Sequence, residues 1–227
     1  MSNRLRVALI GTSQRSRYLY GPIIQGLSSE LELVAVWGRS EKSAAQLATK
    51  LGVESYTDMD LLHREQQPDM AIVSVAYEAN GEVGKMAAAY PMHLLLETPI
   101  AHDLDDALSI MDTCKRMGTK IEVAEQFHRR PLEQIKRKLI ESGVFGEVYS
   151  SFNDFGGHGY HGESIMRSYL GFDAVPLSVS GAVASYKLAP HVTRLEGYSK
   201  ARTETQEHGI IRFDRDKLGI FHWTDVG

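Results

Sequence analysis

The sequence predicts an α/β fold: a doubly wound parallel sheet, followed by a second region with a mostly antiparallel sheet. In the first half of the chain, short apolar segments alternate with amphipathic helical patterns, which is typical of buried parallel strands joined by helices. Beyond about residue 128, strand-like segments follow one another with few helices between them. We therefore place a domain boundary near residue 125.

Five apolar segments provide the predicted parallel strands, and each is too short to be a buried helix. They are Leu5–Ile10, Leu31–Trp37, Ala71–Ala76, His93–Leu96 and Lys120–Ala124.

Two of the intervening segments have clear helical periodicity. Glu41–Leu51 is followed by Gly52, a common residue just past a helix end. Asp103–Met117 begins with acidic residues and ends with basic ones, as the helix dipole favours. The apolar faces are Ala44, Leu47, Ala48 and Leu51 in the first helix, and Ala107, Ile110, Met111 and Cys114 in the second.

The second half has one helical pattern and four strand patterns. Pro131–Ser142 is predicted as an amphipathic helix, with Leu132, Ile135, Leu139 and Ile140 on its apolar face. The strands are Val148–Phe152, Leu177–Ser185, His208–Phe213 and Leu218–Thr224, and the last two flank a hairpin loop at Asp214–Lys217.

The composition excludes several classes of protein. Of 227 residues, 43% are hydrophobic, too many for a disordered chain. The 25 Lys and Arg against 29 Asp and Glu give a net charge of −4, which argues against a nucleic-acid partner. The single cysteine, Cys114, suits a reducing compartment. No secretory signal precedes the first strand, and no apolar segment could span a membrane, so we expect a cytoplasmic protein.

The first strand leads into a candidate phosphate loop, Gly11-Thr12-Ser13-Gln14-Arg15-Ser16. Dinucleotide sites usually have G-x-G-x-x-G here, so that backbone N–H groups approach the pyrophosphate. Ser13 and Ser16 occupy the second and third glycine positions. Pro22 lies too deep for a helix that begins at Gln14, so we expect the regular helix to begin at Gly21 and Pro22. The alternative is an ordinary strand-to-helix turn.

The second strand ends at Gly38-Arg39-Ser40, where NAD-specific sites usually have an acidic residue. Arg39 can pair with a 2′-phosphate, which favours NADP over NAD as the cofactor. The alternative is that Arg39 is a solvated loop residue.

Five segments in the same order and spacing resemble the glucose–fructose oxidoreductase / inositol 2-dehydrogenase / MocA (Gfo/Idh/MocA) family of NAD(P)-dependent oxidoreductases. They are Val7–Gly11, Leu33–Val36, His93–Ala101, Val123–Gln126 and Leu139–Val148.

The resemblance implies a Rossmann dinucleotide-binding domain at residues 1–125 and an α+β domain for substrate binding and oligomerisation at residues 126–227. It implies hydride transfer between a nicotinamide cofactor and a sugar, cyclitol or related polyol, in a homo-oligomer formed through the C-terminal sheet. Family members are longer, so we expect this chain to be a fragment whose second domain is incomplete. The alternative is that a partner subunit covers the exposed surface of the sheet.

The resemblance also assigns site residues. Those expected to bind the cofactor are Gly11, Thr12, Ser13, Gln14, Arg15, Arg39, Ser40, Val75, Ala76, Glu97 and Gln126, the last of these also near the substrate.

The sequence departs from the family where its chemistry is carried. The family lysine in E-K-P is Thr98 here, and a family proline and histidine are Ala76 and Asn80. Threonine cannot act alone as a general acid or base at neutral pH. A family D-x-G-x-H-x-x-D pattern corresponds to 157–164, where only Gly159 and His161 match.

His161 is therefore the expected proton carrier, since histidine titrates near neutral pH. Tyr160 is a second catalytic candidate, and Thr98 is expected to orient a substrate hydroxyl. The alternative for His161 is a capping or packing role. The spacing of His158 and His161 predicts no metal site. A second functional hypothesis is a non-catalytic nucleotide- or sugar-binding regulator on the same fold.

Overall fold

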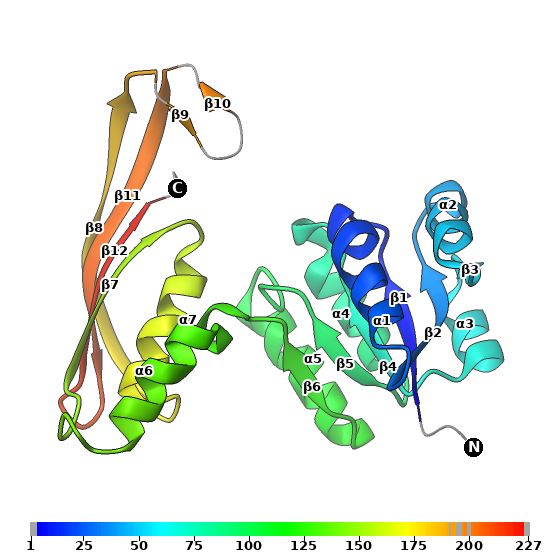
Figure 1. The fold of residues 1–227 in the computed structure, drawn as a ribbon, viewed down its shortest axis with the longest axis horizontal. Helices are drawn as coiled ribbons and strands as arrows, with labels where there is room; N and C mark the ends of the chain where they lie inside the picture. Colours follow the sequence, from blue (N-terminus) through cyan, green and yellow to red (C-terminus); the bar gives the residue numbers. More distant parts are fainter. Residues whose placement is uncertain (1–3, 191, 194–196, 199–200, 225–227) are drawn as a thin grey trace. The chain divides into compact units, whose positions relative to one another are not determined.

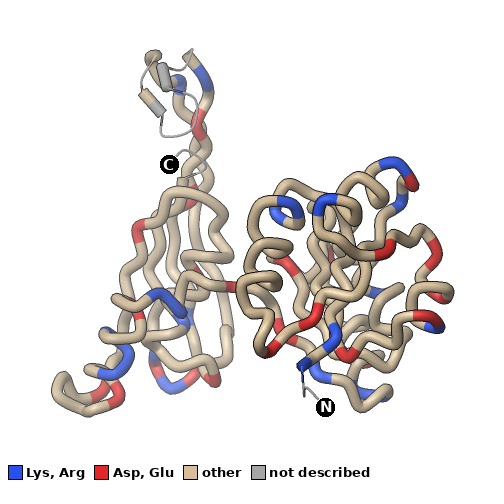
Figure 2. Tube along the Cα trace, turned by 45° about the vertical axis from the view of Figure 1, so that its right-hand side comes forward, with Lys and Arg blue, Asp and Glu red and all other residues tan. Residues whose placement is uncertain are grey.

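The computed structural model describes residues 4–190, 192–193, 197–198 and 201–224. The chain divides into two compact units, Met1–Ala124 and Glu125–Gly227 (Figure 1). Basic and acidic residues are interspersed along both units (Figure 2).

The first unit contains a six-stranded parallel sheet in the order β3-β2-β1-β4-β5-β6. The strands are β1 Leu5–Ile10, β2 Leu31–Trp37, β3 Glu54–Tyr56, β4 Met70–Val73, β5 His93–Leu96 and β6 Ile121–Val123. This order confirms the predicted doubly wound sheet. Dinucleotides bind such sheets where the order reverses, at the carboxyl ends of β1 and β4.

Helices cover both faces of this sheet (Figure 1). They are α1 Gly21–Gly26, α2 Glu41–Leu51, α3 Met59–Gln66, α4 Asn80–Ala88 and α5 Leu104–Met117. Along β1, Val7 and Leu9 join the core with α1 and α2, whereas Ala8 and Ile10 join the core with α3, α4 and α5. This alternation follows from the two-residue period of a strand.

Two expectations about the first unit need correction. The third predicted strand, Ala71–Ala76, ends at Val73. The Ser74 N–H still donates to Ile10 O (2.8 Å), but the chain then turns away from the sheet into the 3₁₀ segment η2, Tyr77–Ala79. Val75 and Ala76 therefore stand in a loop. On α5, Ile110 and Cys114 are buried as predicted, but Met111 is half exposed. The short strand β3 and the helices α3 and α4 were not predicted individually.

The second unit contains a mixed four-stranded sheet in the order β7-β12-β11-β8. The strands are β7 Ser150–Gly156, β8 Pro176–Leu188, β11 Arg202–Phe213 and β12 Leu218–Thr224; a separate pair joins β9 Val192–Thr193 to β10 Gly197–Tyr198. Strand β11 is antiparallel to both neighbours, and only β12 and β7 run parallel, which confirms a mostly antiparallel sheet. The strand predicted at Val148–Phe152 begins instead at Ser150.

One face of this sheet packs against helix α7, Gly159–Leu170. Met166 and Leu170 of α7 form a core with Ile211, Phe213 and Phe221. Because side chains alternate along a strand, their sequence neighbours Ile210 and Ile220 lie on the opposite face. That face is partly open: Ile210, Ile220 and Phe152 are register neighbours and are all exposed.

Helix α6, Pro131–Glu141, forms where the sequence predicts it, but its apolar face is not covered. None of its described residues is buried, and Leu132, Ile135 and Leu139 are 61%, 56% and 46% exposed. The predicted amphipathic helix is therefore present, but its apolar face does not enter a core of the described residues. The predicted hairpin is confirmed: Arg215 and Asp216 have positive φ, and the Phe213 N–H donates to Lys217 O (2.8 Å).

Candidate functional site

Gly11 begins the loop that follows β1, and its backbone conformation is available only to glycine. Its φ is +111°, and a Cβ atom here would lie 2.2 Å from the carbonyl oxygen of Ser74 in the loop after β4. Its N–H donates to Trp37 O (2.8 Å) at the end of β2. Gly11 thus allows the carboxyl ends of three neighbouring strands to meet closely.

The serines at the other two glycine positions form a hydrogen-bonded network. The Ser16 hydroxyl donates to Ser74 O (3.1 Å), and Ser13 Oγ lies 3.1 Å from Ser16 Oγ and 3.0 Å from Ser74 Oγ. Ser13 Oγ also accepts the Ser16 N–H (3.1 Å). Since each hydroxyl has one hydrogen, these contacts direct the Ser13 and Ser16 hydroxyls to each other and to Ser74. The network links the loop after β1 to the loop after β4, where the strand order reverses.

The helix that follows this loop begins earlier than predicted. Helical structure starts at Gln14 and passes through a π-helical segment, η1 Ser16–Tyr20, into α1. The Gly21 N–H donates to Ser16 O, five residues earlier. In a continuous α-helix the Pro22 ring would crowd the carbonyl group four residues earlier, and the wider π turn avoids that clash. Of these helical segments, α1 begins at Gly21 and Pro22 as expected, after the π-helical segment.

A cavity of about 280 Å³ opens at the carboxyl ends of β1, β2 and β4. Its lining residues are Gly11, Thr12, Ser13, Trp37, Gly38, Arg39, Ser40, Ser43, Val75 and Ala76. Seven of them belong to the predicted cofactor-binding set, so the fold brings together three segments that are far apart in the sequence. The lining contains four hydroxyl groups and one cationic side chain but no carboxylate. This chemistry fits a ligand that carries phosphate.

The prediction missed Trp37, Gly38 and Ser43 as lining residues. Ser43 accepts a hydrogen bond from the Thr12 hydroxyl (3.3 Å) and donates to Ser40 O (3.0 Å). A Cβ atom on Gly38 would lie 2.9 Å from Thr12 Cγ2. Ser43 could have been predicted from the sequence. It lies in the first turn of α2, where side chains tilt toward the N-terminus of the helix and so toward the loop that contains Arg39 and Ser40.

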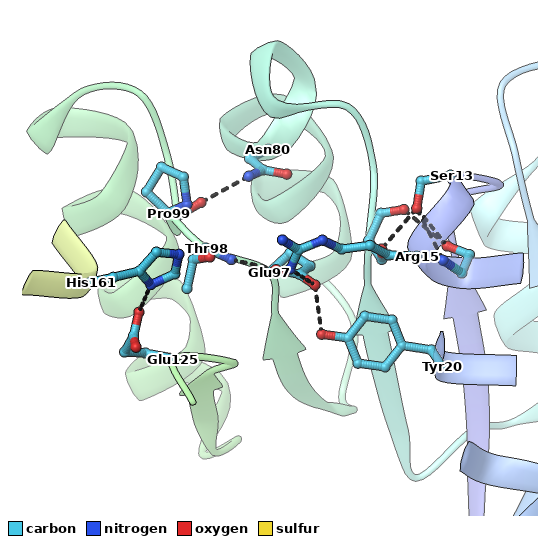
Figure 3. A network of polar contacts seen from close by, with 11 residues as sticks. Ser13, Arg15, Tyr20, Asn80, Glu97, Thr98, Pro99, Glu125 and His161 are labelled. Atoms are coloured by element: carbon cyan, nitrogen blue, oxygen red, sulfur yellow. Dashed lines mark hydrogen bonds and ion pairs between the residues drawn. The ribbon is translucent and has the colours of Figure 1, made fainter. Parts of the chain in front are cut away.

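Arg15 and Glu97, two further predicted cofactor residues, do not line this cavity but bind each other. The Arg15 guanidinium donates to both Glu97 oxygens at 2.8 and 2.9 Å (Figure 3). Glu97 also accepts the Tyr20 hydroxyl (2.8 Å) and the Thr98 N–H (3.0 Å). Burial, reinforced by the Glu97 carboxylate, raises the pKa of Tyr20 well above its usual value. The Glu97 side chain is therefore buried, 6% exposed, and its hydrogen bonds join the loop after β1 to the end of β5.

Thr98 follows Glu97 in a loop that a buried amide holds in place. Asn80, 3% exposed, donates from Nδ2 to Pro99 O (2.8 Å). Asn80 stands where the family has a histidine, so at this position the chain has a group that holds the loop and does not titrate. Gln14, within the candidate phosphate loop, is exposed.

The predicted proton carrier His161 lies in the second unit and is buried, 5% exposed. Its Nδ1 hydrogen-bonds the Glu125 carboxylate (Figure 3). Because an ionised carboxylate only accepts, the neutral imidazole that donates to it has its hydrogen on Nδ1 and its lone pair on Nε2. Glu125 was not predicted as a site residue, although its neighbour Gln126 was. Gln126 is exposed and caps the 3₁₀ segment η3, Phe127–Arg129.

Aromatic rings surround the imidazole of His161. The Phe127 ring lies 4.3 Å from it and the Tyr160 ring 4.4 Å, measured between centroids. Tyr160 and His161 are neighbours in the sequence and both lie in the first turn of α7. The His158 ring lies 6.3 Å from that of His161 and is stacked on Tyr160. In the described part of the chain, no three potential metal ligands gather at one place.

The structure has no described helix that combines the length and the apolar character needed to cross a bilayer.

Comparisons with known proteins agree with this geometry. Residues 5–125 match the Gfo/Idh/MocA family model, described as an oxidoreductase family with an NAD-binding Rossmann fold. The chain is 31% identical over 150 residues to D-glucoside 3-dehydrogenase of Escherichia coli, covering 65% of this chain and 42% of that protein. It is 25% identical over 165 residues to D-apiose dehydrogenase of Rhizobium rhizogenes, covering 67% and 48%. The chain thus matches less than half the length of these two relatives.

Solved structures share the fold. An NAD-binding oxidoreductase from Klebsiella pneumoniae superposes with a TM-score of 0.76 at 18% identity, covering 98% of this chain and 67% of that one. The WlbA dehydrogenase from Chromobacterium violaceum, in complex with NADH and UDP-GlcNAcA, gives 0.76 at 12% identity, covering 99% and 68%. The family match covers more than half of the chain and ends where the first compact unit ends. The chain belongs to the Gfo/Idh/MocA family of oxidoreductases.

Proposed function

We propose that this protein is an NAD(P)-dependent oxidoreductase that transfers hydride between nicotinamide C4 and a carbinol carbon of a sugar, cyclitol or related polyol. The observation that carries this proposal is the cavity beyond Gly11, which lies within the part of the chain that matches the family. The sugar dehydrogenases among the relatives support the substrate class.

The cofactor is held, in this proposal, by the loop Gly11–Ser13, by Arg39 and Ser40, and by Val75 and Ala76. Arg39 with the neighbouring Ser40 and Ser43 hydroxyls supports NADP over NAD, because a guanidinium and hydroxyls can bind a 2′-phosphate. Arg15 and Glu97 have a different role in this proposal. Their ion pair holds the loop after β1 in position, and the backbone N–H groups of that loop contact the phosphates.

His161 carries the proton in the proposed reaction. Glu125 fixes the imidazole through Nδ1, so Nε2 is the atom that accepts the hydroxyl proton during oxidation and returns it during reduction. The resulting imidazolium is stabilised by the same carboxylate. Tyr160 borders the imidazole, and the Thr98 hydroxyl orients a substrate hydroxyl.

The second candidate function is a non-catalytic nucleotide- or sugar-binding regulator, which Thr98 at the family lysine position favours. Titration with NADPH and NADH, followed by turnover assays with a panel of sugars and cyclitols, separates the two. The oxidoreductase proposal requires binding and turnover. Binding without turnover by the protein and by Thr98→Lys would favour the regulator, and binding of neither dinucleotide would contradict both cofactor-based functions.

Two further expectations belong to this proposal. We propose a homo-oligomer formed through the open face of the C-terminal sheet, supported by the exposed neighbours Phe152, Ile210 and Ile220. Light scattering of the protein and of Ile210→Glu tests it, because a charge on that face should shift an oligomer toward monomer, and a monomeric protein would contradict it.

A cytoplasmic location rests on the single cysteine, Cys114, which is buried and unpaired.

A further inference from the structure

A separate cavity of about 160 Å³ lies entirely within the second unit. It is formed by the end of β7, the start of α7 and the facing ends of β11 and β12. Its lining residues are Gly157, His158, Gly159, Thr205, Glu207, Trp223 and Thr224. Glu207 and Trp223 are direct partners in the register of β11 and β12.

The indole of Trp223 is a fixed wall of this cavity. Its Nε1 donates to Asn153 Oδ1 (2.9 Å), and its ring stacks on Phe221 at 4.3 Å. Two glycines of the first turn of α7 make room for it, since a Cβ atom on Gly159 or Gly162 would lie 2.5 Å from an indole atom. Both glycines are in ordinary helical conformation, so the ring explains their presence.

Apart from the two glycines Gly157 and Gly159, the other lining residues have polar side chains. The Glu207 carboxylate is an acceptor, His158 can donate or accept, and the two threonines carry hydroxyl groups. An aromatic surface beside hydrogen-bonding groups suits a molecule with C–H surfaces and hydroxyl groups. The carboxylate disfavours an anionic ligand, because like charges at short range repel.

The cavity adjoins the proposed proton carrier. The His158 ring stacks on Tyr160 at 5.3 Å, and it lies 6.3 Å from the His161 ring. One sugar-sized molecule is long enough to contact both places. The volume is below the roughly 300 Å³ at which pockets begin to enclose a whole drug-sized ligand. The cavity is therefore suited to one end of a larger molecule.

We propose that this cavity is a subsite for a neutral polyhydroxylated ligand. Glu207 accepts hydrogen bonds from ligand hydroxyls, and Trp223 packs against ligand carbons. The inference deepens the proposed function and rests on it for the link to His161. It assigns Glu207 as the residue that selects neutral sugars over sugar acids.

The test measures sugar binding in the absence of any dinucleotide. D-Xylose and its acid, D-xylonate, are titrated into the protein, Glu207→Gln, Glu207→Ala and the control Glu141→Gln, whose carboxylate lies on α6 outside the cavity. Binding is followed by tryptophan fluorescence and calorimetry. We expect D-xylose to bind at least tenfold more tightly than D-xylonate. Glu207→Ala should weaken D-xylose binding about ten- to hundredfold, as loss of a charged hydrogen-bond acceptor does.

Glu207→Gln should reduce the preference for the neutral sugar, and Glu141→Gln should change neither affinity. Trp223→Phe should abolish the fluorescence response while calorimetry still detects binding. Sugar binding that is unchanged in Glu207→Ala, or absent from the protein, would overturn the subsite. Turnover with NADPH or NADP in the same preparations reports on the proposed function separately. Binding that depends on Glu207 without turnover keeps the subsite and removes the oxidoreductase.

Discussion

The two candidate binding regions of this molecule differ most in their charged side chains. The cavity of the first unit lies at the carboxyl ends of parallel strands, and the charged group in its lining is one arginine, Arg39, beside glycines, hydroxyl groups, Trp37, Val75 and Ala76. The second unit presents aromatic rings with carboxylates, Glu125 at His161 and Glu207 opposite Trp223. The first chemistry suits phosphate, and the second suits neutral hydroxyl groups and the transfer of a proton.

The two regions also depart from their motifs in different ways. In the phosphate loop, two glycines are replaced in place by serines, and the hydroxyls bind the loop to Ser74. In the second unit, the acidic positions of the motif are lost, and the carboxylate at His161 comes from Glu125, 36 residues away. A degraded motif in the sequence therefore need not mean a degraded arrangement in the fold.

The largest effect is expected at Gly11. Gly11→Ala should lower the free energy of unfolding by about 3 kcal/mol or more and abolish dinucleotide binding, because Cβ would meet Ser74 O at positive φ. Urea unfolding and NADPH titration measure both. Gly52→Ala is the control: φ is also positive, but no atom lies within 4 Å, so the cost should be about 1 kcal/mol. Equal effects at the two glycines would refute the close-approach argument.

Glu125 tests the second region. Glu125→Gln should lower kcat about a hundredfold with little change in KM, because the amide keeps a hydrogen bond to Nδ1 but cannot stabilise the imidazolium. Steady-state kinetics over a range of pH provides the measurement, with Glu141→Gln as control. A rise in KM alone would show that Glu125 serves substrate binding and not the orientation of His161.

Arg39 tests the nucleotide preference of the first region. Arg39→Ala should weaken NADPH binding about ten- to hundredfold and leave NADH binding unchanged, because only NADPH carries the 2′-phosphate. Arg64→Ala, an exposed arginine on α3, controls for the lost charge. If both dinucleotides lose affinity equally, Arg39 does not contact the 2′-phosphate.

The smallest effect is expected at Tyr20, whose hydroxyl donates to the buried Glu97 carboxylate. The pKa of Tyr20 is raised in the folded state by burial and by Glu97, so the folded protein keeps the phenol proton at a pH where the unfolded chain, with a pKa near 10, releases it. Stability from this group is present below pH 10 and falls above it by about 1.4 kcal/mol per pH unit. Tyr20→Phe should remove that slope from alkaline unfolding curves, whereas Tyr18→Phe, at an exposed site, should not. Identical slopes in both variants would show that Tyr20 is not the source of this pH dependence.

Features that depend on the backbone conformation of a few consecutive residues could be predicted from the sequence. A buried strand ending at Gly11, and a helix ended by Gly52, could be predicted because strand period and left-handed residues are local properties. The π-helical turn before Pro22 was not predictable, since it depends on how a loop enters a helix. The pairs Ser13–Ser74 and Glu125–His161 join residues 61 and 36 positions apart, and no local pattern encodes such contacts.

In the proposed function the first unit binds the dinucleotide and His161 carries the proton, and one comparison of two proteins tests this division most directly. NADPH affinity and turnover of the panel sugar that the protein uses best are measured for the protein and for His161→Gln. We predict unchanged NADPH affinity and a loss of kcat of about a hundredfold or more in the variant. Equal turnover by the two proteins, or NADPH binding by the unaltered protein without turnover of any sugar, would contradict the account.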